Sequence, residues 1–177
     1  MSREEPLCVR CARHQKNCCQ VPQILVTLGD VRRIEAETGQ TEFYEFRLPD
    51  DPAYADQDDD PIWRDNAFQP DGTRRVLKKQ ANGDCAFLGP RGCVLSIDAR
   101  PLVCRLYPFD FTADGILDEP APGCPLELLH PGQQLIPTLG MSRLEAQRWR
   151  AQLYEELQLE GAKKTGERTA LDKDSFG

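Results

Sequence analysis

The chain has 177 residues, of which 40% are hydrophobic and 29% charged, a composition typical of one globular domain with an apolar core. Its 22 Lys and Arg residues against 29 Asp and Glu residues give a net charge of −7, which opposes binding to a phosphate backbone, so we expect no nucleic-acid partner. No apolar run approaches the roughly 18 residues of a transmembrane helix, and the start of the chain carries no apolar signal segment. We therefore expect no membrane association and a cytoplasmic location, where thiols stay reduced.

The first third of the chain is expected to hold a cysteine-rich segment and two helices. Residues 1–23 contain the first four cysteines. Thr27, followed three residues later by an aspartate, forms a capping-box pattern that predicts a helix ending near Gly39. Thr41–Phe46 predicts a further short helix, and the Asp- and Pro-rich stretch 49–61 predicts a loop.

A small antiparallel sheet is expected in the middle of the chain. Asn82-Gly83 is a strong hairpin signal, and it lies between the strand-like segments Arg74–Gln80 and Cys85–Leu88. A Gly-Pro-Arg-Gly turn follows, after which Cys93–Ile97 predicts a third short strand. Asp114-Gly115 predicts the turn of a second hairpin.

Helices complete the expected fold. A proline precedes the predicted short helix Leu102–Leu106, and Ser142, with a glutamate three residues later, opens a predicted helix to about Leu159. The polar stretch 161–177 is expected to form a flexible tail. The elements together predict the α+β class: a small single domain over residues 1–160, with short antiparallel hairpins, a few helices and a cysteine-rich core stapled by metal.

The cysteines are the most unusual feature of the chain. Reduced, clustered cysteines are more often metal ligands or catalytic thiols than a disulfide framework. The Cys-x2-Cys spacing near the start points two thiolates at one ion, as in zinc and iron–sulfur sites. We predict metal binding by all eight, the alternative being structural disulfides or buried hydrophobic thiols. The candidate ligands form two groups in the sequence: Cys8, Cys11, Cys18 and Cys19, and then Cys85, Cys93, Cys104 and Cys124.

The adjacent pair Cys18 and Cys19 does not fit easily on one tetrahedral ion. Because neighbouring side chains generally diverge, each is expected to serve a different metal, or a different iron of one cluster, unless one of them is free and reactive. The second group of cysteines lies on turns rich in Gly and Pro. Such turns let the backbone curl around an ion and donate N–H groups to sulfur.

Basic side chains beside the cysteines are further candidates for the site. Four thiolates around one zinc ion leave a local charge of about −2, which favours nearby cations. Arg91, Arg100 and Arg105 lie within or next to the second group, the alternative being surface or carboxylate-paired positions. His14 could replace one thiolate, or it could be a solvated loop histidine.

Three sequence blocks carry a family resemblance. The first joins the N-terminal cysteines to Thr-Leu-Gly-Asp-Val-Arg-Arg-Ile, the second contains Gly-Asp-Cys-Ala-Phe-Leu and Gly-Cys-Val-Leu-Ser, and the third is Arg-Pro-Leu-Val-Cys-Arg-Leu-Tyr-Pro-Phe. Over roughly residues 8–125 the chain resembles the YkgJ-type cysteine-cluster family, described as zinc- or iron-chelating domains. It departs from the family's opening, because six residues rather than two precede Cys18. The resemblance implies zinc or an iron–sulfur cluster bound through the cysteines.

The favoured function is that of a small cytoplasmic metal-binding protein, with a metal ion or cluster as its partner and no protein partner indicated. The alternative is an iron–sulfur-dependent enzyme, such as a redox protein or a protein lysine N-methyltransferase like the flagellin methylases related to the family. The chain has no Gly-rich nucleotide loop after a strand and no acid–base constellation, so the binding protein is preferred over the enzyme.

The two cysteine groups are expected to meet in the fold. In the N-terminal segment Leu7 and Val9 are the only large aliphatic side chains, so little apolar surface holds it in place. Shared ligation would anchor it to the body of the domain. The competing arrangement is two independent sites, one for each group.

Overall fold

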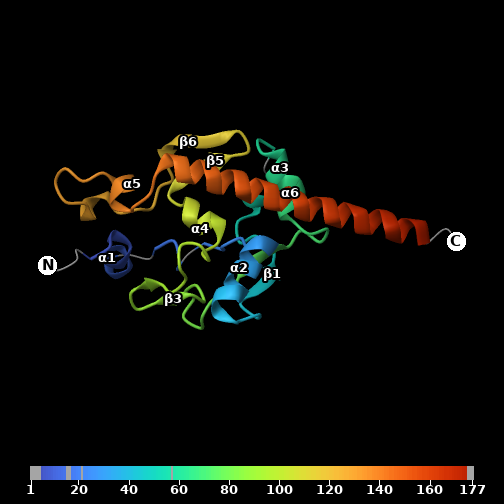
Figure 1. The fold of residues 1–177 in the computed structure, drawn as a ribbon, viewed down its shortest axis with the longest axis horizontal. Helices are drawn as coiled ribbons and strands as arrows, with labels where there is room; N and C mark the ends of the chain where they lie inside the picture. The colour runs from blue at the N-terminus through green and yellow to red at the C-terminus, as the bar shows by residue number, and fades with distance from the viewer. Residues whose placement is uncertain (1–4, 15–16, 21, 57, 175–177) are drawn as a thin grey trace.

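The computed structural model describes residues 5–14, 17–20, 22–56 and 58–174 of the chain. Within these residues, helices combine with three two-stranded antiparallel sheets, which confirms the α+β class (Figure 1). The α-helices are α1 (Leu7–His14), α2 (Leu28–Thr38), α3 (Pro61–Ala67), α4 (Leu102–Leu106), α5 (Leu135–Thr138) and α6 (Arg143–Asp174), with 3-10 turns η1 (Pro52–Ala55) and η2 (Leu126–Leu128). The strands are β1 (Tyr44–Arg47), β2 (Arg74–Leu77), β3 (Leu88–Gly89), β4 (Gly92–Cys93), β5 (Phe109–Thr112) and β6 (Gly115–Pro120).

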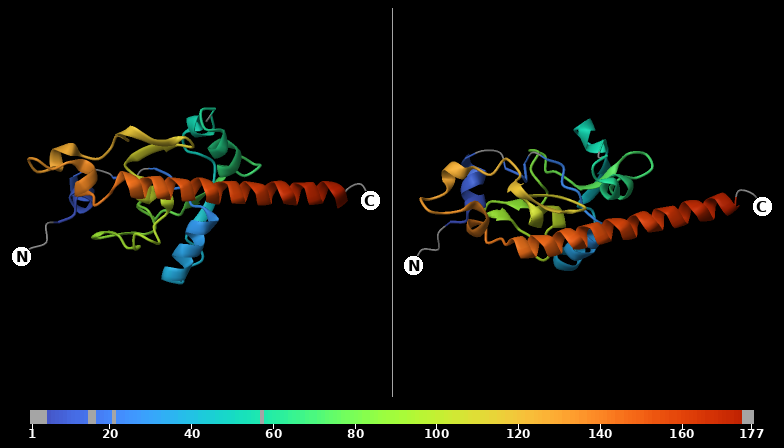
Figure 2. Two further views of the ribbon diagram at one scale, coloured as in Figure 1. Left: turned by 45° about the horizontal axis from the view of Figure 1, so that its top comes forward. Right: turned by 90° about the horizontal axis from the view of Figure 1, so that it is seen from above.

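Helix α6 runs along the length of the molecule and projects beyond it at the C-terminal end (Figures 1 and 2). It packs against α3, α4 and β6. Their shared apolar side chains form the first hydrophobic cluster, in which Leu102, Leu106 and Leu153 have no exposed surface. None of the helices in the described part of the chain has both the length and the apolar character needed to cross a membrane.

All four residues of strand β2 are buried, and its Leu77 belongs to the second hydrophobic cluster. It pairs with β1 on one side, with Tyr44 opposite Leu77. On the other side Leu77 donates its N–H to the carbonyl of Ile24 at 2.9 Å, and Val26 donates to the carbonyl of Arg75 at 3.1 Å. The segment that follows the first cysteine group is therefore held against the body of the domain by backbone hydrogen bonds.

Both predicted capping boxes begin helices. The Thr27 side chain accepts a 2.9 Å hydrogen bond from the N–H of Asp30, whose carboxylate accepts from the Thr27 N–H at 3.0 Å. Helix α2 ends at Gly39, whose φ of 70° is the left-handed conformation that favours glycine. At the start of α6, Ser142 Oγ accepts from the Glu145 N–H at 3.2 Å. Local sequence therefore predicted where the two helices begin.

Two local expectations are wrong, and a third holds over a shorter length. The segment Thr41–Phe46 was expected to be helical, but its second half belongs to β1, because aromatic residues suit a strand and buried β2 offers an open edge. The third strand, expected over Cys93–Ile97, is paired as far as Cys93 and is followed by a turn from Ser96 to Ala99. The Asn82-Gly83 hairpin forms as expected but is short, with Lys79 opposite Cys85 and the Ala86 N–H donating to the carbonyl of Lys78 at 3.0 Å.

The C-terminal helix also differs from its expected length. It was predicted to end near Leu159 with a polar tail from residue 161, but α6 continues to Asp174. The added turns contain good helix formers and no proline. Lys164 further ties them to the body, since its Nζ donates to the carbonyls of Asn66 and Phe68, both at 3.3 Å.

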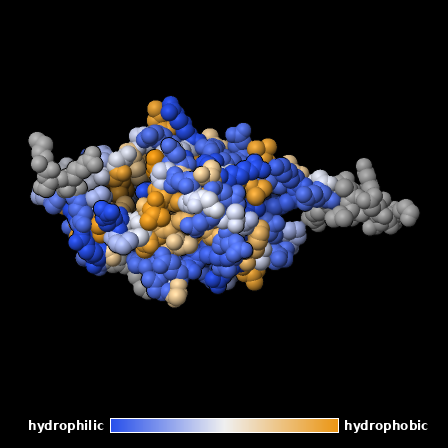
Figure 3. Space-filling view, turned by 60° about the horizontal axis from the view of Figure 1, so that its bottom comes forward, coloured by the Kyte–Doolittle hydropathy of each residue, from blue (hydrophilic) through white to orange (hydrophobic). Residues whose placement is uncertain are grey.

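The surface on the side of α2 and β3 carries both polar and apolar side chains. Figure 3 shows an apolar patch left of centre on this face, surrounded by polar residues. Among the exposed large hydrophobic residues are Val94 and Ile97, which are 65% and 46% exposed. Exposed apolar side chains are normal on protein surfaces.

Candidate metal centre

All eight cysteines are free thiols in the structure. Cys8 and Cys11 lie on α1, and Cys18 and Cys19 lie in the turn that follows it. The remaining four come from separate elements: Cys85 follows the Asn82-Gly83 turn, Cys93 ends β4, Cys104 lies in α4, and Cys124 lies just before η2. All eight cysteines, from both sequence groups, therefore lie in described parts of the chain.

The first set of thiols lies in the second hydrophobic cluster. Cys85 is buried in that cluster, and Cys19, Cys93 and Cys104 pack against it. The N–H of Cys85 donates a 2.7 Å hydrogen bond to the carbonyl of Cys19. The backbone therefore joins one cysteine of the first sequence group to the second group. We call Cys19, Cys85, Cys93 and Cys104 the inner thiols.

The second set of thiols lies where α1 meets η2. These two elements are in contact, and Arg10 of α1 donates from Nη1 to the carbonyl of Leu128 at 2.7 Å. Cys124 precedes η2, and its pKa is raised to about 11, first by burial and then by the thiolate charges of Cys8 and Cys11. We call Cys8, Cys11 and Cys124 the outer thiols. The two sets adjoin, because α1 also contacts β4.

The adjacent pair marks the place where the inner and outer thiols meet. Their side chains were expected to diverge, but a hydrogen bond joins the thiols of Cys18 and Cys19. Alternation of neighbouring side chains is a property of strands, whereas this pair lies in a turn. The turn is closed by Gln20, whose N–H donates to the carbonyl of Asn17 at 2.9 Å, and by Cys19, whose N–H donates to Asn17 Oδ1 at 2.9 Å.

Burial and mutual repulsion disfavour the charged form of most of these thiols. Desolvation is the largest cause of the raised pKa of Cys85, which reaches about 11, and of the raised pKa of Cys104. For both groups the thiolate charge of Cys19 adds to the rise. Cys19 itself differs: the hydrogen bond from Cys18 and the positive charge of Arg100 lower its pKa to about 7. The chain therefore has one thiol that readily becomes a thiolate among several that resist ionisation.

Of the three predicted arginines, Arg100 reaches the thiols. Its side chain hydrogen-bonds Cys93, and its charge favours the thiolates of Cys93, Cys19 and Cys8. Arg105 is buried and instead donates to backbone carbonyls, including that of Arg100 at 2.8 Å. Arg91 is exposed in the turn between β3 and β4.

The imidazole of His14, considered above as a metal ligand, contacts a carboxylate instead. Its Nε2 lies 3.1 Å from Oε1 of Glu127 on η2, a contact between exposed side chains. This contact fastens α1 to η2 beside the outer thiols, so His14 acts at the junction of the two elements.

Sequence reasoning missed Tyr107. Its hydroxyl donates to the carbonyl of Pro122 at 3.0 Å and is in hydrogen-bond contact with Cys124. Gly123 makes room for this contact, since a Cβ there would lie 2.6 Å from the hydroxyl oxygen and its φ is +125°. The sequence signals were the tyrosine after Cys104 and the glycine before Cys124, but nothing in the sequence linked them.

Thiol sulfur is a suitable ligand for zinc and iron, but the described thiols do not surround a common metal position. Within the described residues, no group of three or more His, Cys, Asp or Glu side chains is positioned to hold a metal ion. Cysteine sulfurs are nevertheless the ligands preferred by zinc and by iron–sulfur clusters. Backbone N–H groups of Phe87 and Leu88 favour the thiolate of Cys85, as second-sphere donors do in metal sites.

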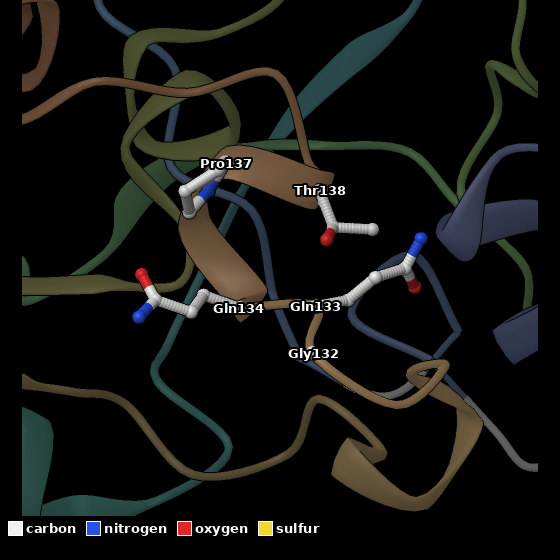
Figure 4. Close-up of a pocket in the computed structure, with 5 residues that line it drawn as sticks. All are labelled: Gly132, Gln133, Gln134, Pro137 and Thr138. Atoms are coloured by element: carbon white, nitrogen blue, oxygen red, sulfur yellow. The ribbon is translucent and has the colours of Figure 1, made fainter.

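Two surface hollows lie away from the thiols. One, of about 350 Å³, is formed at the start of α5 by Gly132, Gln133, Gln134, Pro137 and Thr138, and Figure 4 shows the two glutamine side chains pointing in different directions. The other, of about 370 Å³, is lined by Arg33, Ala36, Glu37, Asp98 and Ala99. Neither has a cysteine in its lining. Comparisons with protein-family models, curated proteins and solved structures found no match to this chain.

Proposed function

We propose that this chain is a cytoplasmic metal-binding protein whose cysteines hold zinc or an iron–sulfur cluster. The observation that carries the proposal is that Cys19, Cys93 and Cys104, all free thiols from separate segments, pack against the hydrophobic cluster that contains Cys85. These segments are far apart in sequence, yet the thiolate charge of Cys19 acts on Cys8, Cys85 and Cys104. Sets of thiols that repel one another when charged are stabilised by a cation between them.

Ligation would use groups that the chain already supplies. The cysteines would hold the metal, Arg100 would offset part of the excess negative charge, and backbone N–H groups would donate to sulfur. Bound metal would supply a cross-link between the N-terminal segment and the body. Because the thiols are not pre-arranged in the described residues, drawing them together would couple binding to local folding.

A binding role is favoured over catalysis. A catalytic metal keeps an open coordination position beside a pocket, whereas a structural site is closed. The two hollows described above are lined by residues other than cysteine. The resemblance to the YkgJ-type family supports chelation, and the enzymatic alternative would require a substrate site beside the thiols.

The test is purification without oxygen, followed by absorbance spectroscopy and elemental analysis. We expect bound zinc in a colourless protein, or iron and sulfide in a coloured one. A variant with all eight cysteines replaced by serine should bind neither, while His14→Ala should keep the full metal content. Wild-type protein that is free of metal and takes up neither zinc nor a reconstituted cluster would exclude the proposal.

A further inference from the structure

The backbone of strand β1 has an open edge on the side away from β2. Strand β2 is central, since β1 pairs with it on one side and residues 24–26 run beside it on the other. Within the described residues, neither a backbone hydrogen bond nor a strand pairing reaches the far side of β1. The N–H and C=O groups of such an edge are ready to pair with a further strand.

The register of the sheet decides which residues of β1 present free backbone groups. Tyr44 lies opposite Leu77, and Phe46 lies opposite Arg75. The backbone groups of Leu77 and Arg75 are directed away from β1, because they pair with residues 24–26. Tyr44 and Phe46 are therefore non-hydrogen-bonded partners of β2 and direct their own N–H and C=O groups outward, to the open edge.

The side chains of β1 and of the residue after it alternate between apolar and charged. Tyr44, Phe46 and Leu48 are the apolar members, and Phe46 and Leu48 are 48% and 63% exposed. The rings of Tyr44 and Phe46 meet edge to face, with centroids 6.4 Å apart. Glu45 and Arg47 are the charged members, with Oε1 and Nη1 3.6 Å apart, and neither forms another ion pair within the described residues.

We infer that the open edge of β1 pairs antiparallel with β1 of a second copy of this chain, about a two-fold axis between the two Phe46 residues. Phe46 then lies opposite its own copy, and the two residues exchange a pair of N–H to C=O hydrogen bonds. Glu45 of each copy lies opposite Arg47 of the other, in the closely spaced non-hydrogen-bonded position where opposite charges stabilise the pairing. Tyr44 lies opposite Leu48 of the second copy, which adds an apolar contact.

The charges select both the register and the partner. Sliding the second copy by two residues in either direction would place Glu45 or Arg47 opposite its own copy, where like charges destabilise the pairing. The edge is thus complementary to itself, which favours a second copy over an unrelated strand. A four-residue strand is short against the roughly 20–30 residues per partner of a stable dimer, so the association should be reversible and depend on concentration. It does not depend on the thiols.

The test measures the mass of the full chain by sedimentation over a range of concentrations, with a reductant that excludes disulfide-linked species. The mass of the wild type should rise toward twice the 20.0 kDa of one chain. Glu45→Arg and Arg47→Glu each place like charges opposite one another, so each should weaken self-association by at least about tenfold. Glu155→Arg makes the same change in charge at an exposed position of α6 and should associate like the wild type.

Mixing the two charge variants tests the register directly. Glu45→Arg and Arg47→Glu complement each other, so an equimolar mixture should dimerise although each variant alone associates weakly, and a chain carrying both substitutions should again form its own dimer. In the wild type, hydrogen exchange at the Phe46 amide should slow as concentration rises, while exchange at the Glu45 amide, which faces β2, should stay constant. A wild-type chain that is monomeric at every concentration, or a dimer that neither substitution weakens, would overturn the inference.

Discussion

The backbone N–H of Cys85 donates a hydrogen bond to the carbonyl oxygen of Cys19 over 2.7 Å. This bond holds the end of the N-terminal segment against the body of the domain without any metal. A few residues later the chain runs beside β2 through the hydrogen bonds of Ile24 and Val26. Cys19 is thus positioned by the fold, whereas α1, which precedes it, is attached by its buried Leu7 and Cys11 and by polar side chains.

Removal of metal should lower the melting temperature and loosen α1 before the rest of the chain. A structural zinc site contributes on the order of 10 kcal/mol, and its loss leaves repelling thiols in place. Calorimetry of loaded and metal-free protein measures the first effect, and hydrogen exchange at the amides of α1 and β2 measures the second. Equal melting temperatures for the two forms would contradict a structural role for the metal.

Replacement of Glu160 by alanine should destabilise the fold by about 3–5 kcal/mol, because it leaves a buried cation without its partner. Glu160 Oε2 accepts from Arg75 Nη1 at 2.9 Å, and both side chains are less than 10% exposed. Glu160 Oε1 also accepts from the N–H of Leu28 at 2.5 Å. Urea unfolding of Glu160→Ala should be compared with the exposed control Glu155→Ala on the same helix, for which we expect a change within about 0.5 kcal/mol.

Two glycines of α6 should respond to alanine with opposite signs. A Cβ at Gly161 would lie 1.6 Å from Asn66 Oδ1 and 2.7 Å from its Cγ, so Asn66 must move and Gly161→Ala should cost about 1–3 kcal/mol. At Gly166 a Cβ would meet no atom within 4 Å, so Gly166→Ala should stabilise the helix by about 0.5–1 kcal/mol. Thermal denaturation of the two variants checks the prediction, and stabilisation by Gly161→Ala would refute the close contact with α3.

Tyr154 should make the stability fall at high pH. Burial and the hydrogen bond from its hydroxyl to Asp60 raise its pKa well above the ordinary value of 10. Below pH 10 the tyrosine is neutral in both states; above it the unfolded chain loses the proton first, so the folded state binds more protons. The free energy of unfolding should then fall by about 1.4 kcal/mol per pH unit from this group. Tyr154→Phe should show a shallower decline between about pH 10 and 11 in urea titrations, and parallel curves would argue against the shift.

The sequence by itself determined the local features of this protein. Thr27 and Ser142 predicted the starts of α2 and α6, and Asp114-Gly115 predicted the turn between β5 and β6, where Thr112 pairs with Gly115. Such features depend on hydrogen bonds and backbone preferences within a few residues, so spacing is enough to reveal them. Of the three arginines named from the sequence, Arg100 lies beside the thiols.

Only the tertiary structure decided the strand partners and the grouping of the thiols. Tyr44–Arg47 became a strand because buried β2 had an open edge, and α6 extends past Leu159 where Lys164 reaches back to α3 and the residues after it. Cys19 lies with Cys85 because its carbonyl accepts the Cys85 N–H, while residues 24–26 pair along β2. These outcomes depend on contacts between residues far apart in the chain, which local patterns do not encode.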